Sequence, residues 1–206
     1  MMQSSKRTIF FIDGLNVYHA IKNSRFNQYK WLDYWELAKK FTGQKDGLKG
    51  VLYFTAYSVW DNEKIKRHKR LVLANRDRGV DVIFGRFRRV TRNCRQCRKK
   101  YQTFEEKRTD VNIAIHLLTN AYKDSYDKAV LISGDSDIIP AVQAVKQAFP
   151  EKEISLVIPV GGKAHELAQV IGSSIRMKEV HLRTSQLPNT VTLKNGVVLQ
   201  RPGEWH

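Results

Sequence analysis

Residues 8–14 read Thr-Ile-Phe-Phe-Ile-Asp-Gly. An uninterrupted apolar run of this length is typical of a strand buried on both faces, and the run ends at Asp13. Similar apolar runs follow at residues 51–57, 80–84, 129–132 and 154–158. Strands buried on both faces occur in parallel sheets that are covered by helices, so these runs indicate the fold class.

Segments with helical spacing lie between these strands. Asp33 can cap the first expected helix, and Gly79 can end the second, which is long and basic. The expected helices cover residues 34–41, 62–78, 109–123 and 136–149. Strands that alternate with helices of this length predict an α/β fold of three layers, with helices on both faces of a central, mainly parallel sheet.

Two stretches interrupt the alternation. Residues 86–107 form a basic, hairpin-like insertion that contains Cys94 and Cys97. Near the end of the chain, an Asn-Gly pair at residues 195–196 lies between two alternating runs, which is a strong hairpin signal. We therefore expect one domain over residues 7–182 and a C-terminal hairpin arm over residues 183–206. An exposed Trp205 and a free hairpin edge would make this arm a candidate contact in a homodimer.

Composition excludes several classes of protein. No run of 18 uncharged apolar residues is present, so a membrane-spanning helix is not expected. The first apolar run follows a short polar start without a separate cleavage region, which argues against a signal peptide. Two cysteines provide no disulfide framework, and this agrees with a reducing compartment, by default the cytoplasm.

Positive charge is concentrated in one part of the chain. The formal net charge is +16, and residues 62–108 contain 17 Lys and Arg against 5 Asp and Glu. A field of this sign favours polyanions, such as nucleic acid or an anionic membrane surface. The alternative is a solvated face that binds nothing specific.

Four aspartates stand near the ends of strands or the starts of helices: Asp13, Asp110, Asp135 and Asp137. Ligands bind beyond the carboxyl ends of parallel strands, so these acids are expected to converge. Asp110 or Asp137, taken alone, could equally be a helix cap. That explanation suits Asp13 and Asp135 less well, because both follow long β-branched runs.

Several carboxylates in one place repel one another unless a cation neutralises them. Ligands that are all oxygen select a hard ion, Mg²⁺ or Mn²⁺. Such an ion lowers the pKa of a bound water and stabilises charge on a phosphodiester. Together with the basic surface, these acids predict a nucleic-acid backbone as the substrate.

Three segments carry a family resemblance: residues 11–18 (FIDGLNVY), 106–115 (EKRTDVNIAI) and 131–140 (LISGDSDIIP). Together they resemble the NYN domain, in the LabA-like branch of the PIN-like nucleases, over residues 7–182. The resemblance implies a PIN-like fold and an acidic pocket that binds a divalent metal ion for RNA cleavage. It also implies that Asp13, Asp110, Asp135 and Asp137 are the metal-binding or catalytic acids.

The resemblance gives Asn16 a role as the pocket amide, which would order Asp13 or a phosphate. From the residues alone, Asn16 could instead be a polar residue in the first turn of a helix. One position departs from the pattern: many relatives carry a further acid where this chain has His116. His116 could ligate a metal or contact phosphate, although a partly buried histidine with satisfied hydrogen bonds is the preferred interpretation.

The insertion is the expected RNA-binding element. Its basic residues, interleaved with aromatic ones, suit phosphate contacts and base stacking on single-stranded RNA, although the aromatic residues could equally be the hairpin's own small core. The expected RNA-binding residues are Arg86, Arg88, Arg89, Arg92, Arg95, Arg98, Lys99, Lys100, Lys107 and Arg108. Cys94 and Cys97 supply half of a tetrahedral zinc site, which His68 or a second chain could complete, but a pair of free thiols is favoured.

The leading hypothesis is a Mg²⁺- or Mn²⁺-dependent endoribonuclease. The alternative, motivated by His116, is an RNA-binding regulator that has the same fold and has lost turnover. A phosphatase with Asp13 as its nucleophile is disfavoured, because that chemistry requires a second acid at the position of Leu15.

Overall fold

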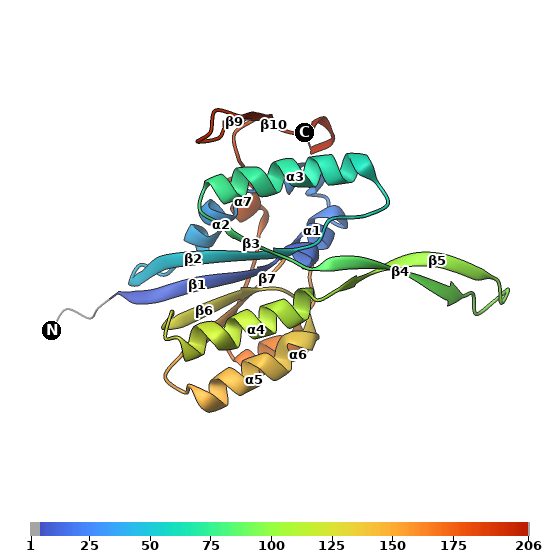
Figure 1. Ribbon diagram of the computed structural model, residues 1–206. Helices are drawn as coiled ribbons and strands as arrows, with labels where there is room; N and C mark the ends of the chain where they lie inside the picture. Colours follow the sequence, from blue (N-terminus) through green and yellow to red (C-terminus); the bar gives the residue numbers. More distant parts are fainter. Residues whose placement is uncertain (1–4, 206) are drawn as a thin grey trace.

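A six-stranded parallel sheet forms the centre of the molecule (Figure 1). The computed structural model describes residues 5–205, so the first four residues of the polar start lie outside the described range. The strand order is β3-β2-β1-β6-β7-β8, and every neighbouring pair is parallel. The strands are β1 (Lys6–Asp13), β2 (Asp46–Thr55), β3 (Asp81–Phe84), β6 (Lys128–Ile132), β7 (Glu153–Ile158) and β8 (Ser174–Arg176). The expected α/β fold is confirmed, and only the short, exposed β8 has no counterpart among the expected strands.

Helices cover both faces of the sheet. One face carries α1 (Gly14–Lys22), α2 (Tyr34–Phe41), α3 (Asn62–Asp77) and α7 (Glu179–Arg183), and the other carries α4 (Thr109–Tyr122), α5 (Ile139–Ala148) and α6 (His165–Ile171). Three short 3-10 helices complete the described fold: η1 (Asn27–Lys30), η2 (Ser136–Ile138) and η3 (Gly203–Trp205). Among the described residues, no helix has the length and apolar character needed to cross a membrane.

The apolar run in β1 is continuous because its residues alternate between two cores. Phe10 and Ile12 pack with α1, α2 and α3, whereas Ile9 and Phe11 pack with α4, α5 and α6. A strand with a hydrophobic core on each face has no polar side that would interrupt the pattern. By the same alternation, the Asp13 side chain lies on the α4 face at the end of the strand.

A buried asparagine joins α3 to the start of α2. Asn75 is fully buried, and its Oδ1 accepts a hydrogen bond from the Tyr34 main-chain N–H at 2.8 Å. Its Nδ2 donates to the main-chain carbonyls of Leu32 and Leu71 at 2.9 and 3.0 Å. No apolar side chain can make these contacts, so this side chain fixes how the two helices meet.

We expect Asn75→Ala to lower the free energy of unfolding by about 2–4 kcal/mol, because it leaves buried main-chain groups without hydrogen-bond partners. Denaturation followed by circular dichroism measures the change. The exposed Arg70→Ala on the same helix is the control, with an expected change within about 0.5 kcal/mol. Equal effects of the two substitutions would contradict this role of Asn75.

The basic insertion is an antiparallel hairpin that projects away from the body of the molecule (Figure 1). It consists of β4 (Arg86–Asn93) and β5 (Lys100–Lys107), so residues 86–107 have the expected form. At its base, Trp60 stacks on Phe104 with ring centres 4.4 Å apart and meets Phe87 edge-on at 4.8 Å. Phe87 and Phe104 therefore serve as a small core that holds the hairpin to the domain, whereas Tyr101 is half exposed.

The C-terminal arm contains the expected hairpin, β9 (Thr190–Thr192) and β10 (Val198–Gln200), but it packs onto the domain. Gly196, with φ +84°, lies in the loop between its strands. The expectation of an exposed Trp205 is wrong: this side chain is 7% exposed and lies 6.1 Å from Trp31, ring centre to ring centre. The indole N–H of Trp31 in turn donates to the Pro188 carbonyl at 2.8 Å. The homodimer stays a prediction, without the exposed tryptophan that motivated it.

Removal of Trp205 tests this packing. We expect Trp205→Ala to lower the free energy of unfolding by about 3 kcal/mol, because it empties part of a hydrophobic core. The exposed Val198→Ala in the same arm should change it by less than about 0.5 kcal/mol. Sedimentation velocity on both variants would show whether the arm forms a dimer. If Trp205→Ala is as stable as the wild type but no longer forms a dimer, Trp205 is a dimer contact, as expected from the sequence.

Candidate functional site

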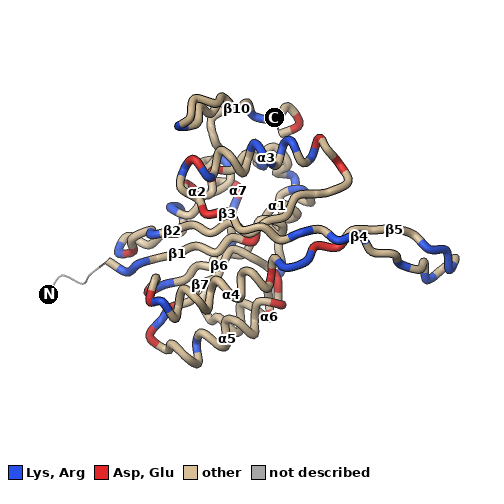
Figure 2. Tube along the Cα trace, viewed as in Figure 1, with Lys and Arg blue, Asp and Glu red and all other residues tan. Residues whose placement is uncertain are grey.

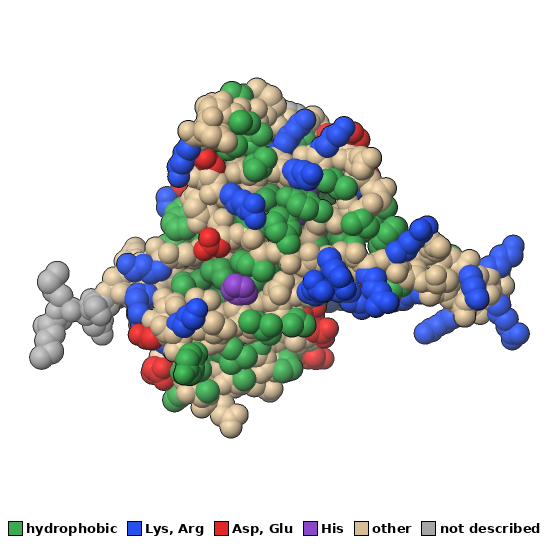
Figure 3. All heavy atoms as spheres, in the orientation of Figure 1, with side chains coloured by type: hydrophobic (Ala, Val, Ile, Leu, Met, Phe, Trp, Pro, Cys, Tyr) green, Lys and Arg blue, Asp and Glu red, His purple; other side chains and the backbone are tan. Residues whose placement is uncertain are grey.

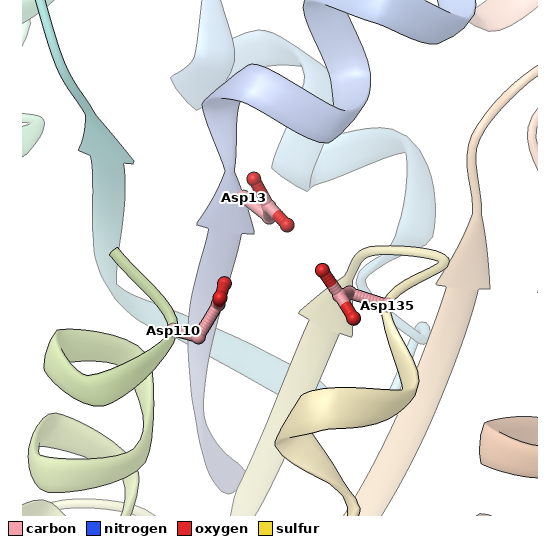
Figure 4. Close-up of side chains that lie close together, drawn as sticks. All are labelled: Asp13, Asp110 and Asp135. Atoms are coloured by element: carbon pink, nitrogen blue, oxygen red, sulfur yellow. The ribbon is translucent and has the colours of Figure 1, made fainter. Parts of the chain in front are cut away.

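Three aspartates from separate elements meet at the carboxyl end of the sheet. Asp13 ends β1, Asp110 lies in the first turn of α4, and Asp135 follows β6. Each offers one carboxylate oxygen, and these oxygens lie within 4.8 Å of one another. Figure 4 shows the three side chains extending into one space. The strand order reverses between β1 and β6, and open parallel sheets bind ligands at such a point.

Asp13 is the most buried of the three acids, with 4% of the residue exposed. Its Oδ1 accepts a hydrogen bond from the Asn16 main-chain N–H at 3.0 Å, and its Oδ2 accepts one from the Ser133 hydroxyl at 2.9 Å. These bonds favour the ionised form, but burial outweighs them. Burial, with smaller contributions from the charges of Asp135 and Glu106, raises the pKa of Asp13 to about 6.

Asp110 occupies the start of α4. Burial raises the pKa of its carboxyl group to about 6, and the charges of Asp135 and Asp13 add to the effect. Arg108, two residues before Asp110, has φ +86°, a left-handed conformation that an arginine rarely adopts. This backbone turn ends the hairpin and directs the first turn of α4 toward β1, so it helps to position Asp110.

Within residues 5–205, none of these three carboxylates forms an ion pair with a lysine or an arginine. Other acids of the fold do: Asp33 pairs with Arg78 and Asp46 with Lys128, each at 2.9 Å. Asp127 pairs with Arg7 at 2.6 Å, and hydrogen bonds from Arg7 lower the pKa of Asp127 to about 2. Negative charge is therefore left uncompensated at one place in the described structure.

The three acids fit a hard divalent cation. Mg²⁺ binds oxygen at about 2.1 Å, so ligands on opposite sides of the ion lie about 4.2 Å apart. Adjacent ligands of the same ion lie about 3 Å apart, so three carboxylate oxygens within 4.8 Å of one another can reach this geometry through rotation of their side chains toward the ion. Donors that are all carboxylate oxygens also match the preference of such ions. The cluster can thus hold a metal ion.

Asp137 is close to the cluster but is not one of the three converging acids. It is exposed in η2, and its charge contributes to the raised pKa of Asp110.

The roles of these aspartates as helix caps also differ from expectation. Asp13 caps α1, and Asp135 caps η2 by accepting from the Asp137 main-chain N–H at 3.0 Å, whereas Asp110 forms no cap. Asp13 and Asp135 therefore combine a capping role with their place in the cluster.

Asn16 connects two parts of the site. Its side-chain Oδ1 accepts from the Gly134 main-chain N–H at 3.0 Å, and its own N–H holds Asp13. No described residue accepts a hydrogen bond from its Nδ2. Two glycines permit this close packing: a Cβ at Gly14 would lie 2.2 Å from the Tyr53 ring, and one at Gly134 would lie 3.0 Å from the Lys163 carbonyl.

Glu106 is a fifth acid of this region, and we did not predict it from the sequence. Its Oε1 accepts from the Thr109 main-chain N–H at 3.0 Å and from the Thr109 hydroxyl. Its charge contributes to the raised pKa values of Asp13 and Asp110. Its position three residues before Thr109, at the start of a helix, was the available signal, but the spacing indicates a cap rather than a place in an acidic pocket.

His116 lies away from the three acids. Its ring meets Phe54 edge-on at 5.5 Å, and it lines a separate cavity together with Lys49, Arg76 and Lys123. Burial lowers the pKa of His116. His116 is not among the side chains that converge with the three acids, so its effect on a metal site stays a prediction.

Positive charge follows the hairpin to its tip (Figures 2 and 3). Two of these cations are already paired with an acid, because Glu105 forms ion pairs with Lys107 at 3.0 Å and with Arg92. The other predicted RNA-binding residues are exposed and form no ion pair within the described part of the chain. The hairpin lies between β3 and α4, so its base is next to the acids.

Cys94 and Cys97 lie at the tip of the hairpin as free thiols. Hydrogen bonds from the main chain at Cys97 and Gln96 lower the pKa of Cys94. His68 does not join them. Its ring packs on Tyr57, with Nε2 3.1 Å from the Thr55 hydroxyl, so this chain's own His68 does not complete a zinc site.

A crystal structure of a protein of unknown function from Vibrio parahaemolyticus RIMD 2210633 has a similar fold, with a TM-score of 0.56 and 17% sequence identity. The similarity covers 86% of this chain and 96% of that one. A 6-hydroxy-3-succinoylpyridine 3-monooxygenase from Pseudomonas putida is 24% identical over 97% of this chain and 75% of its own length. The model of the NYN domain matches residues 7–175, which include the three converging aspartates, and the chain therefore belongs to the NYN domain family.

Proposed function

We propose that the protein is an endoribonuclease that depends on Mg²⁺ or Mn²⁺ and hydrolyses phosphodiester bonds of single-stranded RNA. The observation that carries this proposal is the convergence of Asp13, Asp110 and Asp135, with raised pKa values at two of them and no basic partner within the described residues. NYN domains are PIN-like nuclease domains, and membership in this family agrees with hydrolysis of RNA.

The chain's own residues divide the task. Asp13, Asp110 and Asp135 would hold the cation, with Asp137 and Glu106 adding negative charge around it. When bound, a divalent cation supplies positive charge for the phosphate and lowers the pKa of water. Asn16 orders Asp13 through its main-chain N–H, and its side-chain Nδ2 is suited to donate to a phosphate oxygen. The exposed cations of the hairpin would hold the RNA backbone.

The name of the Pseudomonas relative describes a monooxygenase that acts on a pyridine. Because the two chains are only 24% identical, we assign that activity to the relative and not to this chain. The clustered carboxylates and the basic hairpin of this chain support hydrolysis of a polyanion instead. An RNA-binding regulator without turnover remains the alternative, although His116, its original motivation, lies outside the acid cluster.

Incubation of the purified protein with labelled single-stranded RNA and Mn²⁺ tests the proposal. We expect cleavage by the wild type and none by Asp13→Asn or Asp135→Asn, because each substitution removes a ligand charge. Asp46→Asn, which changes an acid already paired with Lys128, is the matched control and should retain cleavage. Cleavage that survives both substitutions would come from a contaminant. Binding without cleavage by the wild type would establish the regulator instead.

A further inference from the structure

A cavity of about 250 Å³ lies on the face of the sheet opposite to the acids, between α1, α3 and the base of the hairpin. Aromatic rings form much of its wall: Tyr18, Tyr34, Tyr53, Trp60, Phe87 and Trp205. A single water occupies about 30 Å³ of liquid, so the space accommodates a much larger group. We call this space the aromatic cavity.

Positive charge lines the mouth of the aromatic cavity. Lys22 and Lys30 form no ion pair within the described residues, whereas Arg67 pairs with Glu204 at 2.6 Å. Burial, and then the positive charges of Lys22 and Arg67, lower the pKa of Lys30. Lys30 also lies over the Tyr18 ring, 5.7 Å from its centre. Cations gathered in this way are stabilised by an anion, so the charge points to a ligand that carries negative groups.

The wall of the cavity contains polar groups between the rings. The Nε2 atom of His68 lies 3.1 Å from the Thr55 hydroxyl and 3.5 Å from the Tyr53 hydroxyl. Burial lowers the pKa of His68 to about 4, so the imidazole is neutral at pH 7 and can donate or accept a hydrogen bond. Aromatic walls with a few polar groups suit a flat, heteroaromatic ligand.

The aromatic cavity and the acids share the carboxyl end of β1. Asp13 belongs to the acid cluster, and the next residue, Gly14, lines the cavity. Consecutive Cα atoms are about 3.8 Å apart, so the wall of the cavity and the acid cluster adjoin at this end of the strand. Trp60 stands at the cavity, 45% exposed, and its stacking on Phe104 orients it.

We propose that the aromatic cavity binds one nucleobase of single-stranded RNA, with Lys22 and Lys30 on the adjoining phosphate, beside the phosphodiester that the acids cleave. This inference rests on the proposed function for the identity of its ligand. Bases in a duplex are stacked and paired, so only an unpaired base can enter the cavity. The cavity therefore makes the protein select single strands and contribute base contacts in addition to charge.

Fluorescence anisotropy with two labelled eight-nucleotide strands tests the proposal. The measurements are made in EDTA, which removes divalent metal ions and so prevents metal-dependent cleavage. One strand is oligouridine, and the other has the same backbone without bases. We expect the wild type to bind oligouridine about tenfold more tightly, a modest effect for stacking on aromatic side chains. Tyr18→Leu and Trp60→Ala should reduce this ratio to near one. Tyr18 is on α1, away from the hairpin, so its effect does not depend on hairpin support.

Two controls make the outcome specific. Tyr101→Ala removes an exposed aromatic side chain outside the cavity and should leave the ratio unchanged. Arg98→Gln with Lys99→Gln should weaken binding of both strands equally. Equal binding of the two strands by the wild type, or a ratio that depends on Tyr101 rather than on Tyr18 and Trp60, would overturn the proposal. The ratio is measured without cleavage, so loss of the ribonuclease assignment in the Mn²⁺ assay would not affect it.

Discussion

Asp110→Asn is expected to abolish RNA cleavage and, at the same time, to stabilise the metal-free protein. Loss of a metal ligand should reduce the rate of cleavage by at least about a hundredfold. The stabilisation arises because burial and neighbouring charges disfavour the ionised Asp110 carboxylate in the folded state. No described residue donates a hydrogen bond to this side chain, so the substitution removes the charge without leaving a donor unpaired.

The raised pKa of Asp110 determines how the stability of the metal-free protein changes with pH. Asp110 has an ordinary pKa of 3.8 in the unfolded chain and about 6 in the folded protein. The folded state thus retains the proton to higher pH, and the metal-free protein loses stability as the pH rises from about 4 to above 6. A shift of this size corresponds to about 3 kcal/mol, and screening of this half-exposed group by solvent reduces it to about 1 kcal/mol.

Chemical denaturation in EDTA at pH 7.5 and pH 3.5 measures the effect. We expect the free energy of unfolding of Asp110→Asn to exceed that of the wild type by about 1 kcal/mol at pH 7.5 and to come close to it at pH 3.5, where the carboxyl group is mostly protonated in both states. Asp127→Asn is the matched control. Asp127 depends on Arg7 and has a lowered pKa, so its loss should destabilise the protein at pH 7.5. A destabilised Asp110→Asn protein would show that the carboxylate is already compensated.

The second large effect concerns the tip of the hairpin. Replacement of Arg95, Arg98, Lys99 and Lys100 by glutamine should weaken binding of single-stranded RNA about a hundredfold at moderate salt, because four exposed cations are lost. The slope of log affinity against log salt should become shallower by about 0.7 for each lost phosphate contact. The acids lie at the base of the hairpin, so the maximal rate of cleavage should remain, with a raised KM.

Fluorescence anisotropy over a range of salt concentrations measures both the affinity and the slope. Arg92→Gln with Lys107→Gln is the control, because Glu105 already pairs with both side chains. These two substitutions should reduce the affinity for RNA less than any two substitutions at the tip. An unchanged slope after all four tip substitutions would remove the hairpin from the RNA interface.

The sequence predicted the sheet and two of the clustered acids for the same physical reason. Asp13 is the last residue of an apolar strand and Asp135 lies three residues after the end of another, and the ends of parallel strands meet at one edge. For Asp110 the residues alone left a helix cap as an equal alternative, and only the family resemblance favoured the metal site, because its position depends on the hairpin and on the left-handed turn at Arg108. Asp137 was assigned from its spacing to Asp135, but η2 directs the two residues differently.

The features that we could not predict depend on contacts between residues far apart in the chain. Trp205 has the polar neighbours of an exposed residue, and only the fold brings it to Trp31. The aromatic cavity is formed by α1, β2, α3, the hairpin and the C-terminal arm, none of which indicates a cavity alone. His116 has the spacing of an active-site residue, yet the turn of α4 places it against Phe54.

A crystal of the protein soaked in Mn²⁺, with anomalous scattering recorded from manganese, tests the central claim most directly. We predict an anomalous peak between Asp13, Asp110 and Asp135, with carboxylate oxygens at about 2.2 Å, and loss of that peak in Asp110→Asn. The account would be contradicted if these three side chains were turned apart or paired with a lysine or arginine, and manganese bound elsewhere or not at all.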